Sequence, residues 1–222
     1  MVRGARRDGR RRRPGRSHIP PLRLVLDWDG TVTEVDSLHM VLLEFGDVRA
    51  YLQAEEDLGR KLTLHEVISL EFATVRARLE EVVEWLVDNV RVRPGFAELV
   101  ERFHPLVVSS GFHELIEPVL TREGVEVELL ANRLDPSPDG WRVLWRDETV
   151  CEICGESCKR GSVVAGGGPF VYVGDGYSDR CVALAAERVF AIDGLADYLD
   201  GLGVPYERFG DLTDVAQVLA HS

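Results

Sequence analysis

The chain has 222 residues, enough for one main domain with an insertion, and its 45% apolar and 29% charged residues are ordinary for a globular protein. The net charge is −12, but residues 1–18 hold eight arginines and one aspartate, so the remaining chain carries −19. This acidic body argues against a nucleic-acid-binding surface on the folded part. No stretch is long and apolar enough to span a membrane, and no apolar run follows the arginines as an export signal requires. We therefore expect a cytoplasmic protein with no membrane partner.

Residues 1–20 form a basic tail that includes a run of four arginines. We expect this tail to be disordered, because a charged segment with so few apolar residues cannot build a packed core. Contact of the tail with RNA or anionic lipid is one alternative. A chain start assigned upstream of the true one is another.

The first strand is predicted over residues 22–26, which are mostly apolar. Two acids, Asp27 and Asp29, follow it, with Gly30 opening a turn. Alternation along an extended chain sends both acids to one side and Trp28 to the other. Two such close carboxylates repel each other unless a cation or a proton lies between them. A plain Asp-Gly turn is the alternative explanation.

Residues 36–91 predict helices and no strand. Ser37 is expected to cap the first helix, and Thr63 and Glu66 have the spacing of a capping box. The further helices are predicted over residues 47–59, 63–78 and 80–90. We therefore expect a small helical cap over this segment, inserted directly after the first strand.

The core is assigned to residues 21–35 and 92–222. A hairpin is predicted around residues 138–140, and a short helix begins near Gly161. The other predicted elements are a helix over 96–103, a strand over 105–108, a helix over 113–122, strands over 125–130, 170–173 and 189–192, and a closing helix over 212–220. Strands that alternate with helices predict an α/β fold with a doubly wound, Rossmann-like parallel sheet.

Three of the apolar strands end in polar residues, and Lys159 lies on the segment that leads into the third. The carboxyl ends of parallel strands are where ligands bind in such sheets. Three carboxylates make a hard oxygen site that suits Mg²⁺, and the turns at Gly30 and Gly111 offer backbone N–H groups to an anion. The polar residues at these strand ends are Asp27, Asp29, Ser109, Ser110, Asp175 and Asp179.

Four segments, in this order, resemble the motifs of the haloacid dehalogenase-like phosphohydrolases: DWDGTVT from Asp27, VVSSG from Val107, Lys159, and GDGYSD from Gly174. The helical insertion after the first motif resembles the phosphoserine-phosphatase-like branch. Within that branch, the chain is most similar to the group of the methionine-salvage diketo-methylthiopentyl phosphate phosphatases and the phosphoethanolamine/phosphocholine phosphatases. Ser110 departs from the glycine that usually follows the serine of the second motif.

The resemblance implies a role for each matching residue. Asp27 would attack phosphorus and form an aspartyl-phosphate, and Asp29 would act as general acid and then as general base. Mg²⁺ would be held by Asp27, the backbone carbonyl of Asp29, and Asp175, while Asp179 would orient Lys159 or a metal-bound water. The phosphate would be bound by Gly30, Thr31, Ser109, Ser110, Gly111 and Lys159.

Asp36 has two interpretations. The resemblance to phosphoserine phosphatases implies that an acid nine residues after Asp27 contacts the substrate's amine. The alternative is an acid favoured at the start of a helix by the helix dipole.

Cys151, Cys154 and Cys158 lie in a turn that ends at Lys159, and relatives in the same group carry a similar cysteine-rich turn. A permanent disulfide is disfavoured in the cytosol. The spacing is close to that of a structural Zn²⁺ site but supplies only three thiolates, with Cys181 far along the chain. A tight turn of small residues that positions Lys159 is the first explanation and structural zinc the second.

The sequence thus predicts a Mg²⁺-dependent phosphomonoesterase that acts on a small phosphorylated metabolite. A phosphotransferase or phosphomutase on the same scaffold is the alternative enzyme, and an inactive scaffold protein is the alternative without catalysis. A dehalogenase would not need Asp29 or the acids after the third strand. The oligomeric state and the identity of the phosphomonoester stay open.

Overall fold

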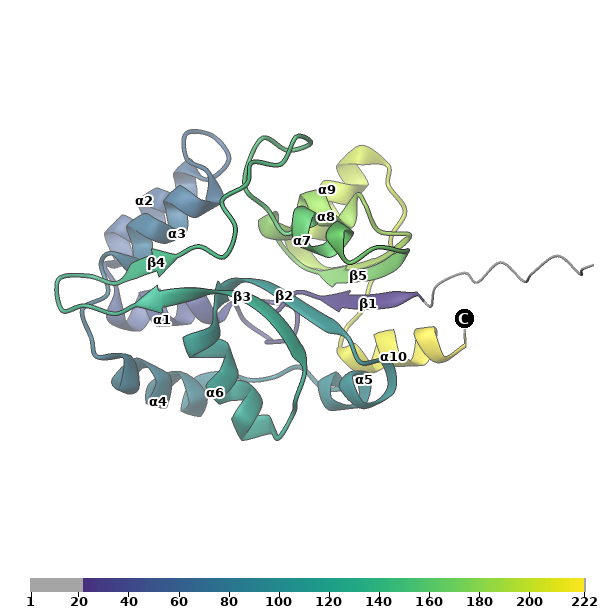
Figure 1. Cartoon of the computed structure of the whole chain (residues 1–222), viewed down its shortest axis with the longest axis horizontal. Coiled ribbons are helices and arrows are strands. Elements are labelled where there is room, and N and C mark those ends of the chain that lie inside the picture. Colours follow the sequence, from purple (N-terminus) through teal and green to yellow (C-terminus); the bar gives the residue numbers. More distant parts are fainter. Residues whose placement is uncertain (1–21, 222) are drawn as a thin grey trace, which may run out of the picture.

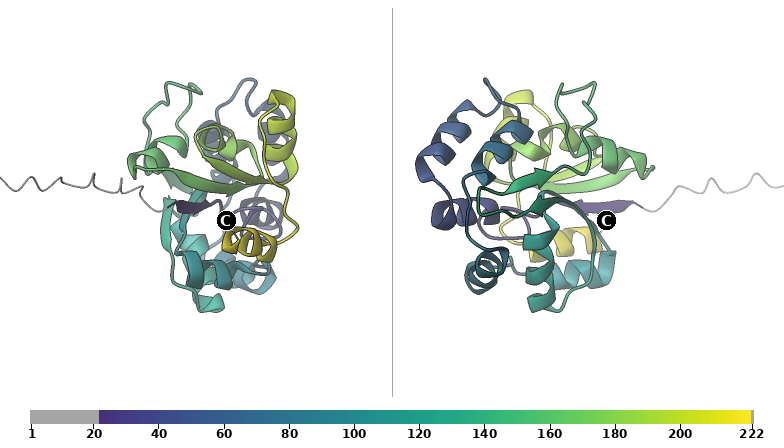
Figure 2. Two further views of the ribbon diagram at one scale, coloured as in Figure 1. Left: turned by 90° about the vertical axis from the view of Figure 1, so that its right-hand side faces the viewer. Right: turned by 60° about the vertical axis from the view of Figure 1, so that its left-hand side comes forward.

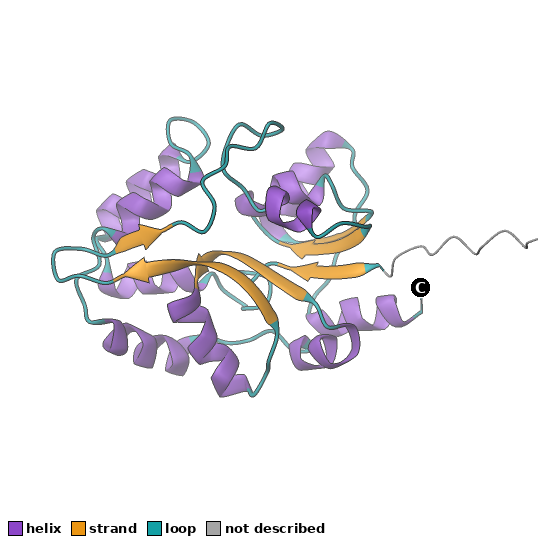
Figure 3. Cartoon of the chain, in the orientation of Figure 1, coloured by secondary structure: helices purple, strands orange, loops and turns teal. Residues whose placement is uncertain are grey.

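The computed structural model describes residues 22–221 and shows an α/β fold, as predicted. A six-stranded sheet runs through the middle of the molecule in the order β4-β3-β2-β1-β5-β6 (Figures 1 and 3). Only β4 is antiparallel to its neighbour. The strands are β1 (Arg23–Leu26), β2 (Leu106–Phe112), β3 (Glu128–Asp135), β4 (Arg142–Leu144), β5 (Phe170–Gly174) and β6 (Arg188–Ala191). The order places β1 between β2 and β5, so the first strand lies at the centre of the sheet.

Helices cover both faces of the sheet, which is why the central strands are mostly apolar and buried. In Figure 1, α5 (Phe96–Phe103), α6 (His113–Glu123) and α10 (Leu212–Ala220) lie below the sheet, and α7 (Arg160–Ala165), α8 (Arg180–Ala183) and α9 (Asp193–Leu202) lie above it. The two turned views show the same layers (Figure 2). Buried side chains form one cluster on each side.

Four helices form the segment between β1 and α5: α1 (Ser37–Phe45), α2 (Val48–Asp57), α3 (Leu64–Phe72) and α4 (Leu79–Asn89). The predicted capping box is present, because Thr63 accepts from the backbone of Glu66 and the Glu66 carboxylate accepts from the backbone of Thr63. The N-cap of α1 is Asp36, not Ser37, since the Asp36 carboxylate accepts from the N–H of His39 at 3.0 Å. The division of the chain into a core and a cap stays a prediction.

Several element bounds differ from the sequence prediction. The β2 strand continues to Phe112, with an irregular register after Val108, so its serines lie within the strand rather than in a following turn. The β3 strand begins at Glu128 and pairs with β4 through the predicted hairpin. The sequence analysis missed α9, because its two glycines, Gly194 and Gly201, lower helix propensity.

Two predictions concern features that the fold does not test directly. Among the described residues, no helix is long and apolar enough to cross a membrane. The predicted basic tail, residues 1–20, lies outside the described residues.

Candidate active site

The three polar strand ends meet at one edge of the sheet. Asp27 and Asp29 follow β1, while Asp175 follows the neighbouring β5. One carboxylate oxygen from each of Asp27, Asp175 and Asp179 lies within 4.8 Å of the other two. Carboxylates from two strands are therefore close enough to share one ion.

Lys159 lies among these acids and is almost completely buried, with 4% of its surface exposed. Its Nζ donates to Asp27 Oδ1 at 2.5 Å and to Asp179 Oδ1 at 2.7 Å. Burial alone would lower the pKa of Lys159, but the charges of Asp179 and Asp27 raise it above its ordinary value. Lys159 is thus held as a cation beside the predicted nucleophile.

Asp179 is held by several donors besides Lys159. Its Oδ1 accepts from the hydroxyl of Tyr172 at 2.6 Å, and its Oδ2 accepts from the backbone N–H groups of Asp175 and Gly176 at 2.9 and 3.0 Å. Burial works against ionisation, yet Lys159 and these hydrogen bonds lower the pKa of Asp179. Asp179 therefore orients Lys159 and fixes the backbone at Asp175.

Asp29 is held by two serines. Ser37 donates both its hydroxyl and its backbone N–H to Oδ1, and the Ser109 hydroxyl donates to Oδ2 at 3.1 Å. Burial and the charge of Asp36 raise the pKa of Asp29 to about 6, although the serine hydrogen bonds oppose that rise. A carboxyl group that titrates near neutral pH suits a general acid and base. Sequence reasoning missed Ser37 as a partner of Asp29, because no motif marks it.

Thr31 and Gly30 support Asp175 in this structure. The Thr31 hydroxyl donates to Asp175 Oδ1 at 2.9 Å. Gly30 has φ +75°, and a Cβ there would lie 2.3 Å from Asp175 Oδ2, so a side chain would strain the backbone and displace the Asp175 carboxylate. Burial and Asp179 raise the pKa of Asp175 to about 7. Phosphate binding by Gly30 and Thr31 stays a prediction.

The β2 residues Ser109, Ser110 and Gly111 also reach this edge. Ser109 Oγ accepts the backbone N–H of Gly111 at 2.8 Å, so this N–H already has a partner. Ser110 lines the cavity above the acids, and its carbonyl accepts from Asn132 at 2.8 Å. A Cβ at Gly111 would lie 2.9 Å from Asp29 Oδ2. Phosphate binding by Ser109, Ser110 and Gly111 stays a prediction.

The donors and the charge of the site fit a divalent cation. Among the described residues, Lys159 is the one buried lysine or arginine, and it donates to Asp27 and Asp179, with Asp175 close to both acids. Burial and the neighbouring Asp179 raise the pKa of Asp27 well above its ordinary value, as expected for acids that one lysine cannot neutralise. Oxygen donors of this kind are those that Mg²⁺ prefers.

A cavity of about 400 Å³ extends from these acids to the helices between β1 and α5. Glu71 of α3 lines it, is 3% exposed, and has a buried Oε1 with no hydrogen-bond partner. Burial and the charge of Glu55 raise the pKa of Glu71 to about 8. Asp36 also lines this cavity together with Asp27 and Asp29, and it is at the same time the N-cap of α1.

The cysteine turn precedes Lys159, as predicted, but it has a fourth member. One sulfur from each of Cys151, Cys154, Cys158 and Cys181 lies within 4.8 Å of the other three. The sequence analysis left Cys181 out because it is 23 residues beyond Cys158 in the printed sequence. The packing of α8 beside α7 brings it back to the turn.

The fold and the site define an α/β enzyme with a cluster of carboxylates at the carboxyl ends of its central strands. The chain belongs to the family of haloacid dehalogenase-like hydrolases, whose family model matches residues 24–184.

Curated relatives include two proteins named 2-hydroxy-3-keto-5-methylthiopentenyl-1-phosphate phosphatase. The one from Brevibacillus brevis is 28% identical, and the one from Geobacillus kaustophilus is 30% identical; each alignment covers 88% of this chain and 94% of the relative. These matches confirm the prediction of a phosphatase within this family.

Solved structures of phosphoserine phosphatases share the fold. The structure of a phospho-aspartyl intermediate analogue of phosphoserine phosphatase matches this chain with a TM-score of 0.66 at 19% identity. The match covers 89% of this chain and 98% of the phosphatase. The enzyme from T. onnurineus has a TM-score of 0.62 at 20% identity, with 91% and 96% covered. The predicted fold class is confirmed, and in its fold the chain resembles phosphoserine phosphatases.

Proposed function

We propose that this protein is a Mg²⁺-dependent phosphomonoesterase that acts on a small phosphorylated metabolite through an aspartyl-phosphate on Asp27. The observation that carries the proposal is the position of Asp27. Its carboxylate contacts Lys159 at 2.5 Å and lies within 4.8 Å of carboxylate oxygens of Asp175 and Asp179. This arrangement places the proposed nucleophile beside a buried cation and a set of oxygen donors; Lys159 and a bound cation would both favour its ionised form.

In the first step, a carboxylate oxygen of Asp27 forms a bond to phosphorus while the bond from phosphorus to the ester oxygen breaks. Asp29 donates its proton to the leaving oxygen. In the second step, Asp29 removes a proton from water, the water oxygen bonds to phosphorus, and the bond to Asp27 breaks. A pKa of about 6 allows Asp29 to hold a proton in one step and accept one in the next.

The charges around Asp27 support this chemistry. Lys159 is positioned to offset the repulsion between the carboxylate and an incoming phosphate. We assign the Mg²⁺ ligands to Asp27, the backbone carbonyl of Asp29, and Asp175. When bound there, the ion would neutralise charge on the phosphoryl group. Asp179 acts through Lys159 and through the backbone of Asp175, both of which it contacts.

The cavity favours a leaving group with both an aliphatic part and a polar part. Its aliphatic lining consists of Val35, Leu38, Leu58, Leu64 and Ile68. The polar side carries Asp36, Glu55 and Glu71 with one base, His39, whose Nε2 lies 3.8 Å from carboxylate oxygens of Asp36 and Glu55. Burial would lower the pKa of His39, but Glu55 and Asp36 raise it to about 9.

Two classes of leaving group fit this lining, and Glu71 separates them. A neutral, hydroxyl-bearing methylthio chain, as in the named substrate of the curated relatives, would take a hydrogen bond from protonated Glu71 and pack on the aliphatic side. A cationic amine would pair with ionised Glu71, whose Oε1 is buried without a partner. The free Oε1 favours the second class, and the relatives favour the first.

The test is a panel of phosphate monoesters assayed with and without Mg²⁺: p-nitrophenyl phosphate, phosphoserine, phosphoethanolamine, phosphocholine and a methylthio-sugar phosphate. We expect Mg²⁺-dependent phosphate release, and we expect Asp27→Asn to abolish it while circular dichroism stays unchanged. Turnover by Asp27→Asn at the parent rate would contradict the assignment of Asp27. Phosphate transfer to an added alcohol, in place of release to water, would favour the phosphotransferase.

Glu71→Gln then identifies the leaving group, because glutamine has the shape of the protonated acid but cannot ionise. With a cationic substrate, kcat/KM should fall by about 10- to 100-fold, the loss expected for an unpaired buried charge. With a neutral substrate, the change should stay within about threefold. Glu34→Gln, an exposed residue of the same cavity, is the matched control.

A further inference from the structure

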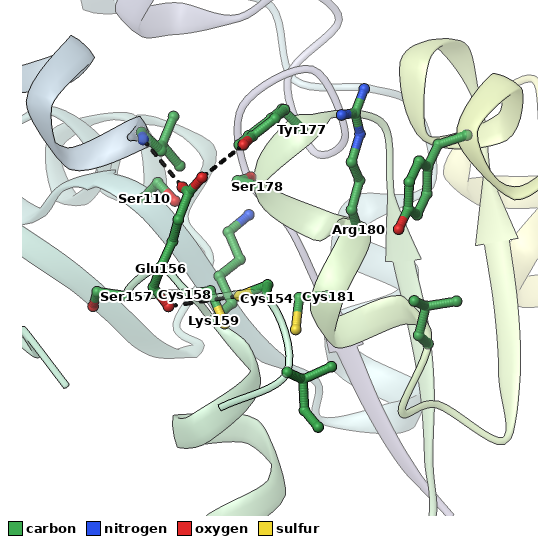
Figure 4. A pocket seen from close by; sticks show the side chains of 14 residues that line it. Ser110, Cys154, Glu156, Ser157, Cys158, Lys159, Tyr177, Ser178, Arg180 and Cys181 are labelled. Carbon is green, nitrogen blue, oxygen red and sulfur yellow. Dashed lines mark hydrogen bonds between the residues drawn. The ribbon is translucent and has the colours of Figure 1, made fainter. Parts of the chain in front are cut away.

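The four cysteines form a second cluster of potential metal ligands, separate from the acids of the active site. Three come from the turn between β4 and α7, and Cys181 comes from α8. All four sulfurs lie within 4.8 Å of one another, and the cysteines are not disulfide-bonded. Figure 4 shows Cys154, Cys158 and Cys181 beside Lys159 in the pocket that they line.

The spacing of the sulfurs matches a tetrahedral metal site. Thiolate–zinc bonds are about 2.3 Å long, so two sulfurs of one tetrahedron lie about 3.8 Å apart. The Sγ atoms of Cys151 and Cys181 are 3.8 Å apart. A disulfide would need about 2.05 Å.

The backbone of the turn directs N–H groups at the sulfurs. The N–H groups of Ile153 and Cys154 hydrogen-bond to the sulfur of Cys151, and the N–H of Arg160 hydrogen-bonds to that of Cys158. The turn closes through Gly155, which has φ +78° and donates to the carbonyl of Cys151 at 2.8 Å. The turn therefore holds three of the four sulfurs close together before any metal binds.

We propose that Cys151, Cys154, Cys158 and Cys181 bind one structural Zn²⁺ as four thiolates. The proposal extends the three-cysteine set of the sequence analysis by the ligand that the fold supplies. The proposal stands on the geometry of the four sulfurs.

The position of the cluster gives the ion a structural role in the active site. Cys158 directly precedes Lys159, and Cys181 follows Asp179 by two residues. Zinc bound to both cysteines would tie together the two segments that carry the Lys159–Asp179 ion pair. A tetrathiolate site carries a net charge of −2, and Arg160, whose Nη1 donates to the carbonyl of Cys181 at 3.1 Å, lies close enough to offset part of it.

The same turn also reaches the helices between β1 and α5. Glu156 accepts from the hydroxyl of Tyr177 at 2.9 Å (Figure 4). It also accepts from the backbone N–H of Leu64, at the start of α3, at 3.3 Å. A metal that rigidifies the turn would therefore hold Glu156 as well as Lys159. The proposed zinc would thus position Lys159 and Glu156 without contacting the reacting atoms.

The experiment measures metal directly, so its outcome does not depend on the proposed phosphatase activity. The full chain is produced in medium with zinc, exchanged into metal-free buffer, and analysed by elemental mass spectrometry. We expect one zinc per chain in the parent and in Glu152→Gln, an exposed control in the same turn. Cys154→Ser and Cys181→Ser should each lose most of the zinc; Cys154 is exposed, so its variant should fold.

Cobalt substitution gives a second readout. Co²⁺ added to the zinc-free parent should give the thiolate charge-transfer band and the visible bands of a tetrahedral site, and these bands should weaken in Cys181→Ser. If the reduced parent contains no zinc by mass spectrometry and shows no cobalt absorption bands, the proposal is overturned. Full zinc retention in Cys181→Ser would exclude the fourth thiolate, and a Cys151–Cys181 disulfide in the native protein would overturn the site.

Discussion

Asp29→Asn should make the protein more stable while it removes activity. The Asp29 carboxyl is buried, and its pKa rises from an ordinary value of 3.8 to about 6. A group whose folded pKa is raised binds its proton more tightly in the folded state, so its ionisation opposes folding. The loss of folding free energy caused by ionised Asp29 begins near pH 4, grows as the pH rises to about 6, and is constant above that.

The size of this cost follows from the two pKa values. Each pH unit between them corresponds to about 1.4 kcal/mol, so ionised Asp29 costs about 3 kcal/mol at pH 8 and about half of that at pH 5. The amide can keep the local hydrogen bonds. The amide oxygen of the new side chain would accept from Ser37. The amide nitrogen would donate to Ser109 Oγ, which in the parent protein donates to Asp29 instead. We therefore expect a gain of about 1 to 3 kcal/mol at pH 8 in Asp29→Asn.

The assay is urea unfolding of the parent and of Asp29→Asn at pH 5 and pH 8, with Mg²⁺ removed by a chelator. The difference in the free energy of unfolding should be larger at pH 8, and kcat at pH 7 should fall by about 10²- to 10⁴-fold. Glu34→Gln, which is exposed, should show the pH dependence of the parent. Equal stability of parent and Asp29→Asn at both pH values would refute the claim that burial raises the pKa of Asp29.

Two further predictions concern the partners of these acids. Ser37→Ala removes the hydroxyl hydrogen bond that lowers the pKa of Asp29, so the limb of the kcat profile that requires ionised Asp29 should move to higher pH by about half to one unit. An unmoved profile would show that the Ser37 hydroxyl does not tune Asp29. Asp175→Asn should raise the Mg²⁺ concentration for half-maximal activity by about tenfold or more. Asp193→Asn, in the same cavity, should leave that concentration unchanged, and an equal rise there would argue against Asp175 as a ligand.

The sequence determined the fold class and the identity of the acid cluster. Short apolar strands, each followed by polar residues, required a parallel sheet with those residues at one edge, since alternation and strand direction are local properties. Asp27, Asp175, Asp179 and Lys159 lie together as that pattern predicted.

Only the tertiary structure decided which other side chains complete each cluster. Ser37 reaches Asp29 because α1 starts beside the loop after β1, and Cys181 reaches the cysteine turn because α8 packs beside α7. No motif marks either residue, since both contacts depend on how separate elements pack. Glu71 became a candidate for substrate recognition for the same reason: α3 buries it at the wall of the cavity. The order of apolar strands and polar residues is a property of the local chain, whereas contacts between elements arise from burial of their apolar faces against one another.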